Sequence, residues 1–362
     1  MPKSDVPLRR GWTTGACATA AAKAAFTALL TGNFPDPVEI VLPKGQKVSF
    51  AIAKESLNAT SAMVAIVKDA GDDPDVTHGA MVEVTVSLGF KSSGLVFRAG
   101  CGVGMVTKAG LPIGVGEPAI NPIPRKMISS VIEELAAINS SRPDVIIEIS
   151  IPGGEELALK TWNPRLGIVG GLSILGTTGI VIPFSCSAWI HSIHRGIDVS
   201  RAAGVSHVGA STGSTSEAAV RKKYDLPESS ILDMGDFAGG TLKYLRSHPI
   251  SRVTIAGGFA KLAKLGQGHL DLHSARSQID LDWLANLAGS LSADNKTLDG
   301  IRNANSAMEV LDISSEKKLP LANLVADQAR LRCLEVLSSA PVAIEVLIFD
   351  RLGELSGVAR GW

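Results

Sequence analysis

Small and apolar residues fill the first periodic segment of the chain, which reads ACATAAAKAAFTALL over residues 16–30. Thr13 and Thr14 precede this run and can cap a helix, and Gly32 can end one. We therefore predict a helix whose small side chains allow close packing against a sheet. Because Arg9 and Arg10 stand before the Thr-Thr-Gly turn, the helix start is also a candidate anion site, with ordinary capping as the alternative.

Short β-branched or alternating segments dominate the next part of the chain. They cover residues 38–43, 48–56, 63–69, 81–89 and 95–99, which predicts an antiparallel or mixed sheet. A helix is expected over residues 125–138, after two prolines, and strands over 144–152 and 157–162. This region is predicted to be an α+β domain with a mixed sheet, spanning residues 1–180.

The rhythm changes in the second half, where strand and helix patterns alternate. Strands are expected at 206–211, 230–236 and 252–258, and helices at 217–226 and 240–248. Residues 278–339 are mostly helical in pattern, and 342–350 read as a last buried strand. Such alternation is typical of a parallel sheet with crossover helices. We predict a Rossmann-like α/β domain over residues 185–362, so the fold class combines α/β with α+β in two domains.

The charge balance, the cysteines and the lack of long apolar runs limit the classes of protein to which this chain can belong. In 362 residues, Lys+Arg and Asp+Glu both total 35, so no general field attracts nucleic acid or an anionic membrane. The four cysteines are far apart, the N-terminus lacks the apolar core of a signal peptide, and no long apolar run is present. We expect a cytoplasmic protein with no nucleic-acid or membrane partner, and a homo-oligomer is possible.

Residues 98–126 hold six glycines and four prolines in 29 positions. Mixing of this kind indicates a long, ordered loop, where binding and catalysis concentrate, although a simple connector has the same composition. Cys101 lies between two glycines in this loop. It is a candidate nucleophile, but a small residue in a tight turn explains it more simply.

Four carboxylates and a histidine crowd residues 69–78. Gly71 and Pro74 enforce a turn there, so the acids are expected to cluster at a strand end. Repulsion between close carboxylates raises at least one pKa, which suits proton transfer or cation binding. The spacing departs from the EF-hand pattern, and a solvated acidic turn is the alternative. The candidate catalytic residues are Asp72, Asp73, Asp75 and His78.

A second site is expected where predicted parallel strands end. The segment from Val208 to Glu217 has the form of a strand, a Gly/Ser/Thr loop and a helix, which can hold the polar parts of a nucleotide-like ligand. It matches neither a dinucleotide nor a phosphate-loop fingerprint, and tight turns with helix caps are the alternative. The candidate cofactor-binding residues are Gly209, Ser211, Thr212, Gly213, Asp233, Asp236, Gly257 and Gly258.

Two histidine pairs, His191 with His194 and His269 with His273, have the spacing of metal ligands. Neither pair has an obvious third ligand, so no metal site is predicted and a structural or substrate-contacting role is favoured. Lys261 and Lys264 precede the second pair and suggest a loop that binds carboxylates.

Several long blocks together resemble one family. RRGWTTGACATAAAKAA, DAGDDPDVTHG, GCGVGMVTKAGL, GEPAINPIPRKMI, NPRLGIVGGLSILGTTGIV and GGFAKLAKLGQGHLDLHS are similar to the CbiD family of cobalt-precorrin-5B C1-methyltransferases, across nearly the whole chain. The resemblance implies methyl transfer from S-adenosylmethionine to ring carbon C1 of cobalt-precorrin-5B, giving cobalt-precorrin-6A in cobalamin biosynthesis. Together with the strand-end pattern above, we expect a corrin-substrate domain over residues 1–180 and the donor site within 185–362.

A corrin precursor carries many carboxylates, so cationic and polar side chains should line its cleft. The candidates are Arg10, Thr13, Thr14, Cys101, Lys108, Asn121, Arg125, Lys264, His269 and His273, with Arg9, Lys126 and Arg165 as further cations. The glycines of 98–126 are expected to form a wall for the ring. A non-catalytic tetrapyrrole carrier and an NAD-linked reductase are the alternative functions, the latter disfavoured by the missing dinucleotide fingerprint.

Overall fold

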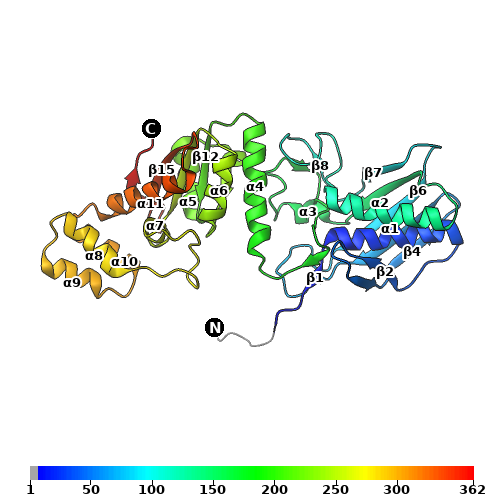
Figure 1. The fold of residues 1–362 in the computed structure, drawn as a ribbon, viewed down its shortest axis with the longest axis horizontal. Coiled ribbons are helices and arrows are strands. Elements are labelled where there is room, and N and C mark those ends of the chain that lie inside the picture. Colours follow the sequence, from blue (N-terminus) through cyan, green and yellow to red (C-terminus); the bar gives the residue numbers. More distant parts are fainter. Residues whose placement is uncertain (1–6) are drawn as a thin grey trace. The chain divides into compact units, whose positions relative to one another are not determined.

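The structure is a computed structural model that describes residues 7–362, and the chain divides into two compact units between Cys186 and Ser187. Each unit contains helices and at least one five-stranded sheet (Figure 1). The predicted mixture of α and β structure is therefore confirmed. No helix among residues 7–362 combines the length and the apolar character needed to cross a bilayer.

The first unit is built on a mixed sheet with strand order β4-β5-β6-β9-β7. Its pairs are antiparallel except for β7 with β9, which run parallel. The central strand β6 alternates buried valines with partly exposed residues, as expected for a sheet with one covered face. The strands are β4 Lys54–Leu57, β5 Ser61–Val67, β6 Met81–Leu88, β7 Leu95–Ala99 and β9 Val145–Ser150.

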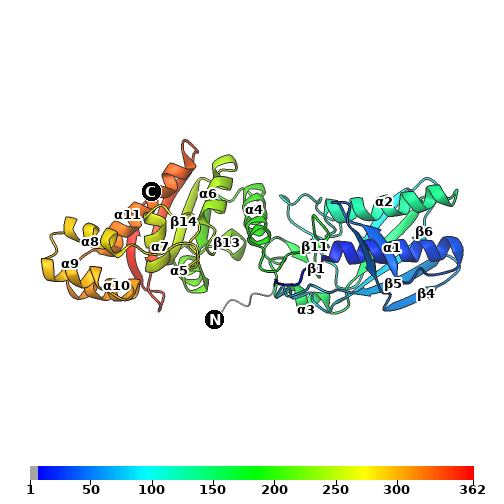
Figure 2. The same cartoon turned by 60° about the horizontal axis from the view of Figure 1, so that its bottom comes forward.

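Helix α1, Thr14–Thr31, packs against β5 and β6 and lies beside α2, Pro122–Ile138 (Figure 2). Its alanines are almost fully buried, so the small side chains bring the helix backbone close to the sheet. Thr13 accepts a hydrogen bond from the Ala16 amide and Gly32 adopts a left-handed conformation, which confirms the predicted start and end.

Smaller pieces complete the first unit. β2 (Val38–Val41) pairs with β3 (Lys47–Phe50), so the predicted strand 48–56 is in fact two strands in two different sheets. The predicted strand at 157–162 is wrong. Gly153 turns the chain with a φ of +76°, and the good helix formers that follow make the short helix α3, Gly154–Ala158. The remaining pairs are β1 (Gly11–Trp12) with β11 (Ile180–Val181) and β8 (Met105–Val106) with β10 (Ile168–Val169).

The second unit contains a sheet with order β13-β12-β14-β15-β16, parallel except for β16. The strands are β12 His207–Ser211, β13 Ile231–Asp233, β14 Arg252–Gly258, β15 Ala343–Phe349 and β16 Leu355–Ala359. The predicted alternation of strands and helices is confirmed. The strand predicted to be the last is followed by β16, because Asp350 forms a tight turn by accepting the amides of Leu352 and Glu354.

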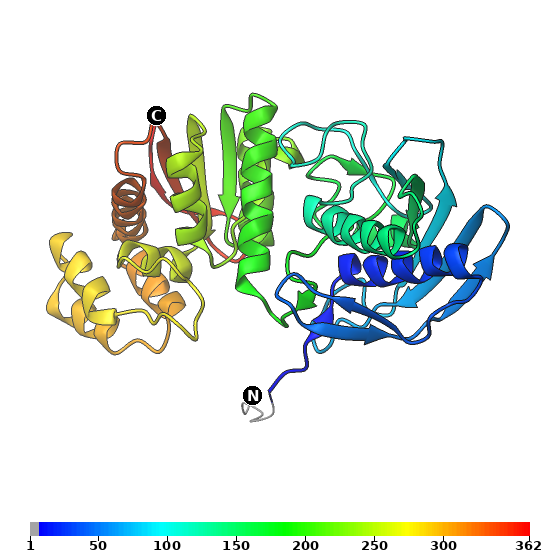
Figure 3. The same cartoon turned by 45° about the vertical axis from the view of Figure 1, so that its right-hand side comes forward.

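Helices cover both faces of this sheet. Val208, Ala210 and Leu232 point into the larger core, which α4, α6, α7 and α11 share. Val220 of α5 meets Ile231 on the opposite face. Figure 3 shows α4 running alongside the sheet, and α8 to α10 form a small helical cluster near α11. The helices are α4 Cys186–Ala202, α5 Ser214–Tyr224, α6 Ala238–Ser247, α7 Phe259–Gly266, α8 Leu281–Ser290, α9 Asn295–Arg302, α10 Ala307–Glu316 and α11 Leu321–Leu337.

Candidate functional site

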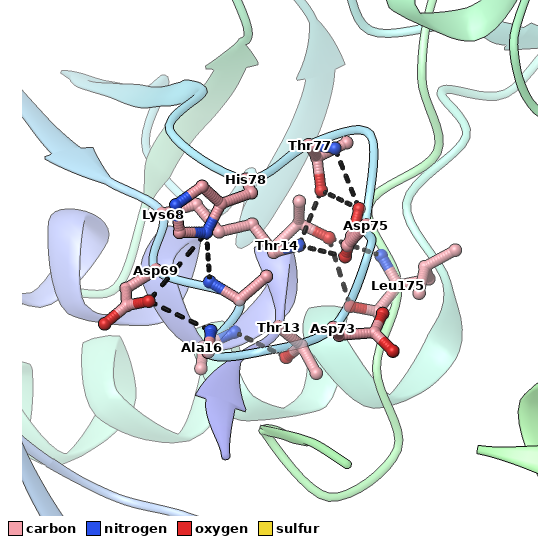
Figure 4. Close-up of polar contacts among 12 residues, drawn as sticks. Thr13, Thr14, Ala16, Lys68, Asp69, Asp73, Asp75, Thr77, His78 and Leu175 are labelled. Carbon is pink, nitrogen blue, oxygen red and sulfur yellow. Dashed lines mark hydrogen bonds and ion pairs between the residues drawn. The ribbon is translucent and has the colours of Figure 1, made fainter. Parts of the chain in front are cut away.

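The acidic turn between β5 and β6 is built around a buried lysine (Figure 4). Lys68 is 2% exposed, and its ammonium contacts the Asp75 carboxylate and donates to Thr77 Oγ1 at 2.5 Å. The other oxygen of Asp75 accepts the Thr77 amide at 2.8 Å and its hydroxyl at 2.6 Å. Lys68, Asp75 and Thr77 thus satisfy one another's hydrogen-bonding groups, so Asp75 has a structural role in the turn.

The outer carboxylates of the turn hold neighbouring chain segments. Asp69 forms a bidentate ion pair with the Arg9 guanidinium, and Asp72 accepts the Arg9 amide at 2.6 Å. Asp73 accepts the amide of Phe184 at 2.8 Å. His78 is exposed, and its Nδ1 accepts the Ala70 amide at 3.1 Å. The four acids lie in one turn after β5, but each carboxylate has a partner of its own, and the turn also joins Arg9 to Phe184 near the end of the first unit.

The electrostatics of the turn differ from the prediction. Hydrogen bonds from Arg9 and from the Gly71 amide lower the pKa of Asp69 to about 2. Burial by itself raises the pKa of Asp75, but the charge and hydrogen bond of Lys68 and the bonds from Thr77 outweigh it and lower that pKa. For these two residues a raised pKa is not found, because each carboxylate has a cation beside it.

The start of α1 uses its threonines for structure. The Thr13 hydroxyl caps the helix, and Thr14 Oγ1 donates to the Leu175 carbonyl and accepts the Leu175 amide, each at 3.2 Å. Both threonines are buried. Their hydroxyls support the capping alternative, whereas the Arg10 side chain nearby is exposed.

The Gly/Pro loop is ordered, and its own chain covers its buried glycines. A Cβ on Gly102 would stand 1.9 Å from the Ile151 carbonyl oxygen, and one on Gly104 would stand 2.5 Å from Ile168. Gly102 and Gly104 therefore allow close approach of the protein's own chain, so these two are not available to the predicted wall for a ring. Other positions of the loop stay exposed, among them Gly114, Gly116 and Val115, which is 60% exposed.

Charged and polar side chains of this loop have defined partners. The Arg125 guanidinium donates to the carbonyls of Ile120 and Pro118 and forms an ion pair with Glu117 at 2.9 Å. Cys101 lies 3.6 Å from Glu155, whose negative charge raises the pKa of the thiol. Arg125 thus holds the loop, and Cys101 lacks the electropositive surroundings of a nucleophile.

Other candidates in the first unit remain accessible. Lys108 is half-buried with its stem against Gly167, and Lys126 is exposed. Asn121 precedes α2, and among residues 7–362 its side chain makes no capping hydrogen bond.

The carboxyl ends of three strands meet in the second unit, as predicted. Ser211 is level with Asp233 on one side and with Ala256 on the other. The Gly235 amide donates to the Ser211 carbonyl, and the Thr212 amide donates to that of Ala256. The strand order reverses direction between β12 and β14, so a crevice is expected at this point of the edge.

Two features of this edge leave room for a ligand: a buried hydroxyl without a hydrogen-bond partner among residues 7–362, and a glycine with open space beside it. Ser211 is fully buried, yet its hydroxyl has no hydrogen-bond partner within residues 7–362. Among the same residues, nothing lies within 4 Å of the point where a Cβ on Gly213 would stand. Lys261 donates to the Thr212 carbonyl at 2.8 Å and lies 3.1 Å from Asp236 in an ion pair. Gly257, unlike Gly213, has a close neighbour: a Cβ on Gly257 would stand 2.6 Å from Thr212 Oγ1.

The predicted carboxylate-binding loop near the second histidine pair is in fact partly helix. Lys264 lies in α7 and is 7% exposed, and its ammonium donates to the Leu272 carbonyl at 3.1 Å. Its apolar stem follows the amphipathic pattern of α7 into the core, which removes it from the candidates for binding substrate. His273 Nδ1 accepts the Ala275 amide, and His269 is half-buried.

The first histidine pair lies on α4. The rings of His191 and His194 are 6.1 Å apart, and His194 stacks on Tyr244 with 3.8 Å between ring centres. In the described part of the chain, no three or more metal-ligating side chains gather as a metal site.

Two residues at these sites were not found from the sequence. Lys68 ends an apolar strand run and directly precedes the acids, which is the signal that could have paired it with them. Trp189 lies on α4, a helix that was not predicted, and its indole N–H donates to the Asp233 carbonyl at 3.0 Å. The amphipathic spacing of Ile193 and Ile197 marks that helix in the sequence.

The chain is thus a mixed α/β protein with an acidic turn in one unit and a parallel-strand edge in the other. Its sequence matches the family model CbiD over residues 1–183 and the model CbiD, C-terminal domain, over residues 271–360. The chain belongs to the CbiD family.

Named relatives agree with this assignment. A cobalt-precorrin-5B C(1)-methyltransferase of Brucella anthropi is 61% identical over 96% of this chain and 95% of its own. A protein of the same name from Paramagnetospirillum magneticum is 58% identical over 98% of both chains. The crystal structure of the cobalamin biosynthesis protein cbiD from Archaeoglobus fulgidus aligns with 86% of this chain and 85% of its own, at 25% identity and a TM-score of 0.39.

Proposed function

We propose that this protein transfers the methyl group of S-adenosylmethionine to C1 of cobalt-precorrin-5B, giving cobalt-precorrin-6A in cobalamin biosynthesis. The proposal rests on relatives near 60% identity that carry the name cobalt-precorrin-5B C(1)-methyltransferase and match the chain across both units. Identity of 56% to a third such protein, from a Bradyrhizobium strain, over 98% of this chain supports the same reaction.

The donor is assigned to the second unit, which we interpret as a Rossmann-like α/β domain. The observation that carries this assignment is the strand edge, where the order reverses beside Gly213 and Ser211. Ligands of open α/β sheets bind at such a point, outside the carboxyl ends of the strands. An unpartnered buried hydroxyl and a glycine with open space beside it fit a polar ligand that approaches the backbone closely.

The residues of this edge have distinct roles in the proposal. The first amides of α5 point toward the edge and favour the polar, anionic part of the donor. Asp233, level with Ser211, is placed to accept from ribose hydroxyls. Lys261 links Asp236 to the loop after β12, which holds the two loops of this edge together. S-adenosylmethionine supplies the electrophilic methyl group, so the protein's task is chiefly to position it.

The acceptor is assigned to the first unit, residues 1–180. Arg10 and Lys126 are exposed, and Lys108 is half-buried, so these cations are candidates for the carboxylates of a corrin precursor. Asp72, Asp73 and His78 are the remaining candidates for proton transfer, since Asp75 is paired with Lys68. Thr13, Thr14, Arg125 and Lys264 are withdrawn as direct ligands because their polar groups already have internal partners.

The decisive experiment supplies the protein with methyl-labelled S-adenosylmethionine and cobalt-precorrin-5B and locates the label. Label at C1 is expected, and absence of label where an active relative transfers it contradicts the proposal. If the corrin binds but S-adenosylmethionine does not, the protein is instead a tetrapyrrole carrier.

A glycine pair tests the donor site by itself. Gly213→Val fills the open space before α5 and should abolish binding of S-adenosylmethionine without lowering the melting temperature. Gly289→Val, at an exposed position of α8, is the control and should bind normally. Unchanged affinity in Gly213→Val would place the donor elsewhere.

A further inference from the structure

A large aromatic side chain is exposed at the same strand edge. Trp189 lies in the first turn of α4 and is 45% exposed, although indole rings bury a large apolar area when they can. Its helix buries Ile193 and Ile197 against the sheet, so helix packing does not require the tryptophan. The exposed ring therefore calls for another explanation.

The indole is held in one orientation. Its N–H donates to the Asp233 carbonyl at 3.0 Å, at the end of β13. Three ring atoms lie 3.6 to 3.7 Å from the point where a Cβ on Gly235 would stand, and the Phe237 ring is 6.2 Å away at an angle of 51°. A ring fixed on one side and exposed on the other is preorganised to stack, because little rotamer entropy is left to lose.

The position of the ring along the sheet indicates what would stack on it. β13 stands at the end of the strand order, one strand, or about 4.8 Å, from β12, at whose carboxyl end the donor is proposed to bind. A nucleoside whose ribose meets Asp233 would have its base close to the loop that follows β13, residues 233–235. That is where the backbone of residues 233–235 carries the indole of Trp189.

We propose that Trp189 stacks on the base of the nucleoside held at the carboxyl edge of β12 and β13, and thereby sets the affinity for the adenosine part of the methyl donor. The proposal rests on the donor site proposed above. It adds a base-binding residue from α4, which precedes the strands of the sheet.

The test uses S-adenosylhomocysteine as the probe and calorimetry of the full chain. Trp189→Ala should weaken binding about tenfold, or about 1.4 kcal/mol, since stacking on one base is of this order. Trp189→Phe keeps an aromatic face and should bind within about threefold of the wild type. Methionine alone, which has no base, should bind all three proteins equally.

Trp362 supplies a matched control. It is also 45% exposed and lies in the same unit, but its ring contacts His207 and Arg252, at the amino ends of β12 and β14. Trp362→Phe should leave the affinity unchanged. Titration with S-adenosylhomocysteine should quench tryptophan fluorescence in the wild type and in Trp362→Phe, and the quench should disappear in Trp189→Phe although the probe still binds.

The outcomes separate this proposal from the donor site itself. If the wild type binds the probe and Gly213→Val does not, but Trp189→Ala binds as tightly as the wild type, the stacking proposal is overturned and the site stands. A quench that persists in Trp189→Phe also overturns stacking. If the wild type fails to bind the probe, or Gly213→Val binds it normally, the donor site is wrong and the stacking proposal with it.

Discussion

At the scale of single residues, the acidic turn shows how a cluster of like charges is made stable. Lys68 is almost fully buried, whereas Asp75 is 24% exposed, and the two are in direct contact. Removing one partner of such a pair leaves the other charge without compensation in a region of low dielectric. The turn therefore depends on a residue that the acids themselves do not reveal.

Lys68→Met tests this dependence. We expect it to lower the free energy of unfolding by about 3 kcal/mol, because Asp75 loses its buried partner. Lys54→Met is the control, since it removes a pair of 3.6 Å in which Lys54 is 55% exposed, and should cost at most about 1 kcal/mol. Urea unfolding measures both, and equal effects would contradict a structural role for the buried pair.

Asp69 gives a prediction for pH. Its pKa is lowered to about 2 by the hydrogen bonds from Arg9 and the Gly71 amide, against about 3.9 in an unfolded chain. A lowered native pKa adds stability above pH 4, and this contribution is lost as the pH falls through about 4 toward 2. Asp69→Asn should therefore melt slightly below the wild type at pH 7, and the difference should narrow at pH 3. A difference that widens in acid would be inconsistent with this assignment.

The outer acids are tested without removing their structural contacts. Asp72 and Asp73 each accept a backbone amide, so alanine would loosen residues 9 and 184 as well as remove a carboxylate. Asp72→Asn with Asp73→Asn keeps an acceptor at both positions. We expect turnover to fall by about 10²-fold or more if they transfer protons, with unchanged affinity for S-adenosylmethionine. Turnover near the wild-type rate would exclude them as acid or base.

At the scale of elements, periodicity predicted what local patterns determine. The α1 run, the alternating strands of the first sheet and the strand–helix order of the second unit all follow from hydrophobic spacing. The strand expected at 157–162 failed because the turn at Gly153 is set by backbone geometry that the pattern does not encode. The partner of Gly102 could not be predicted either, since Ile151 lies far along the chain and only the folded loop brings them together.

Gly102 and Gly116 allow two reasons for a glycine to be compared, a positive φ and the close approach of a neighbouring group. Both have positive φ, +71° at Gly102 and +85° at Gly116, but a neighbour blocks a Cβ only at Gly102, as far as the described residues show. Gly116→Ala should cost about 1 to 2 kcal/mol from backbone strain. Gly102→Ala must also move the Ile151 carbonyl and should cost well above 3 kcal/mol, roughly at the upper end for overpacking. Equal melting temperatures would show that the loop yields at Gly102.

At the scale of the whole molecule, each unit has a core of its own. Buried side chains from α1, α2 and the first sheet form one cluster, and those from the second sheet and its helices form another. The family assignment followed from long sequence blocks, whereas the roles of single residues depended on contacts such as Lys68 with Asp75 that only the fold supplies. Separate cores make it possible to ask which unit a ligand stabilises.

One substitution in each core answers that question. Ile147 and Ile255 are both fully buried, in the first and second unit respectively, and Ile→Val should cost each core about 1 kcal/mol. A ligand that binds only the folded second unit stabilises it by about 2.7 kcal/mol at a hundred times its Kd. S-adenosylhomocysteine should therefore raise the unfolding temperature of the second unit, the transition that Ile255→Val lowers. The transition lowered by Ile147→Val should not respond, and a ligand shift confined to that transition would move the donor site to the first unit. Differential scanning calorimetry with and without the probe measures both.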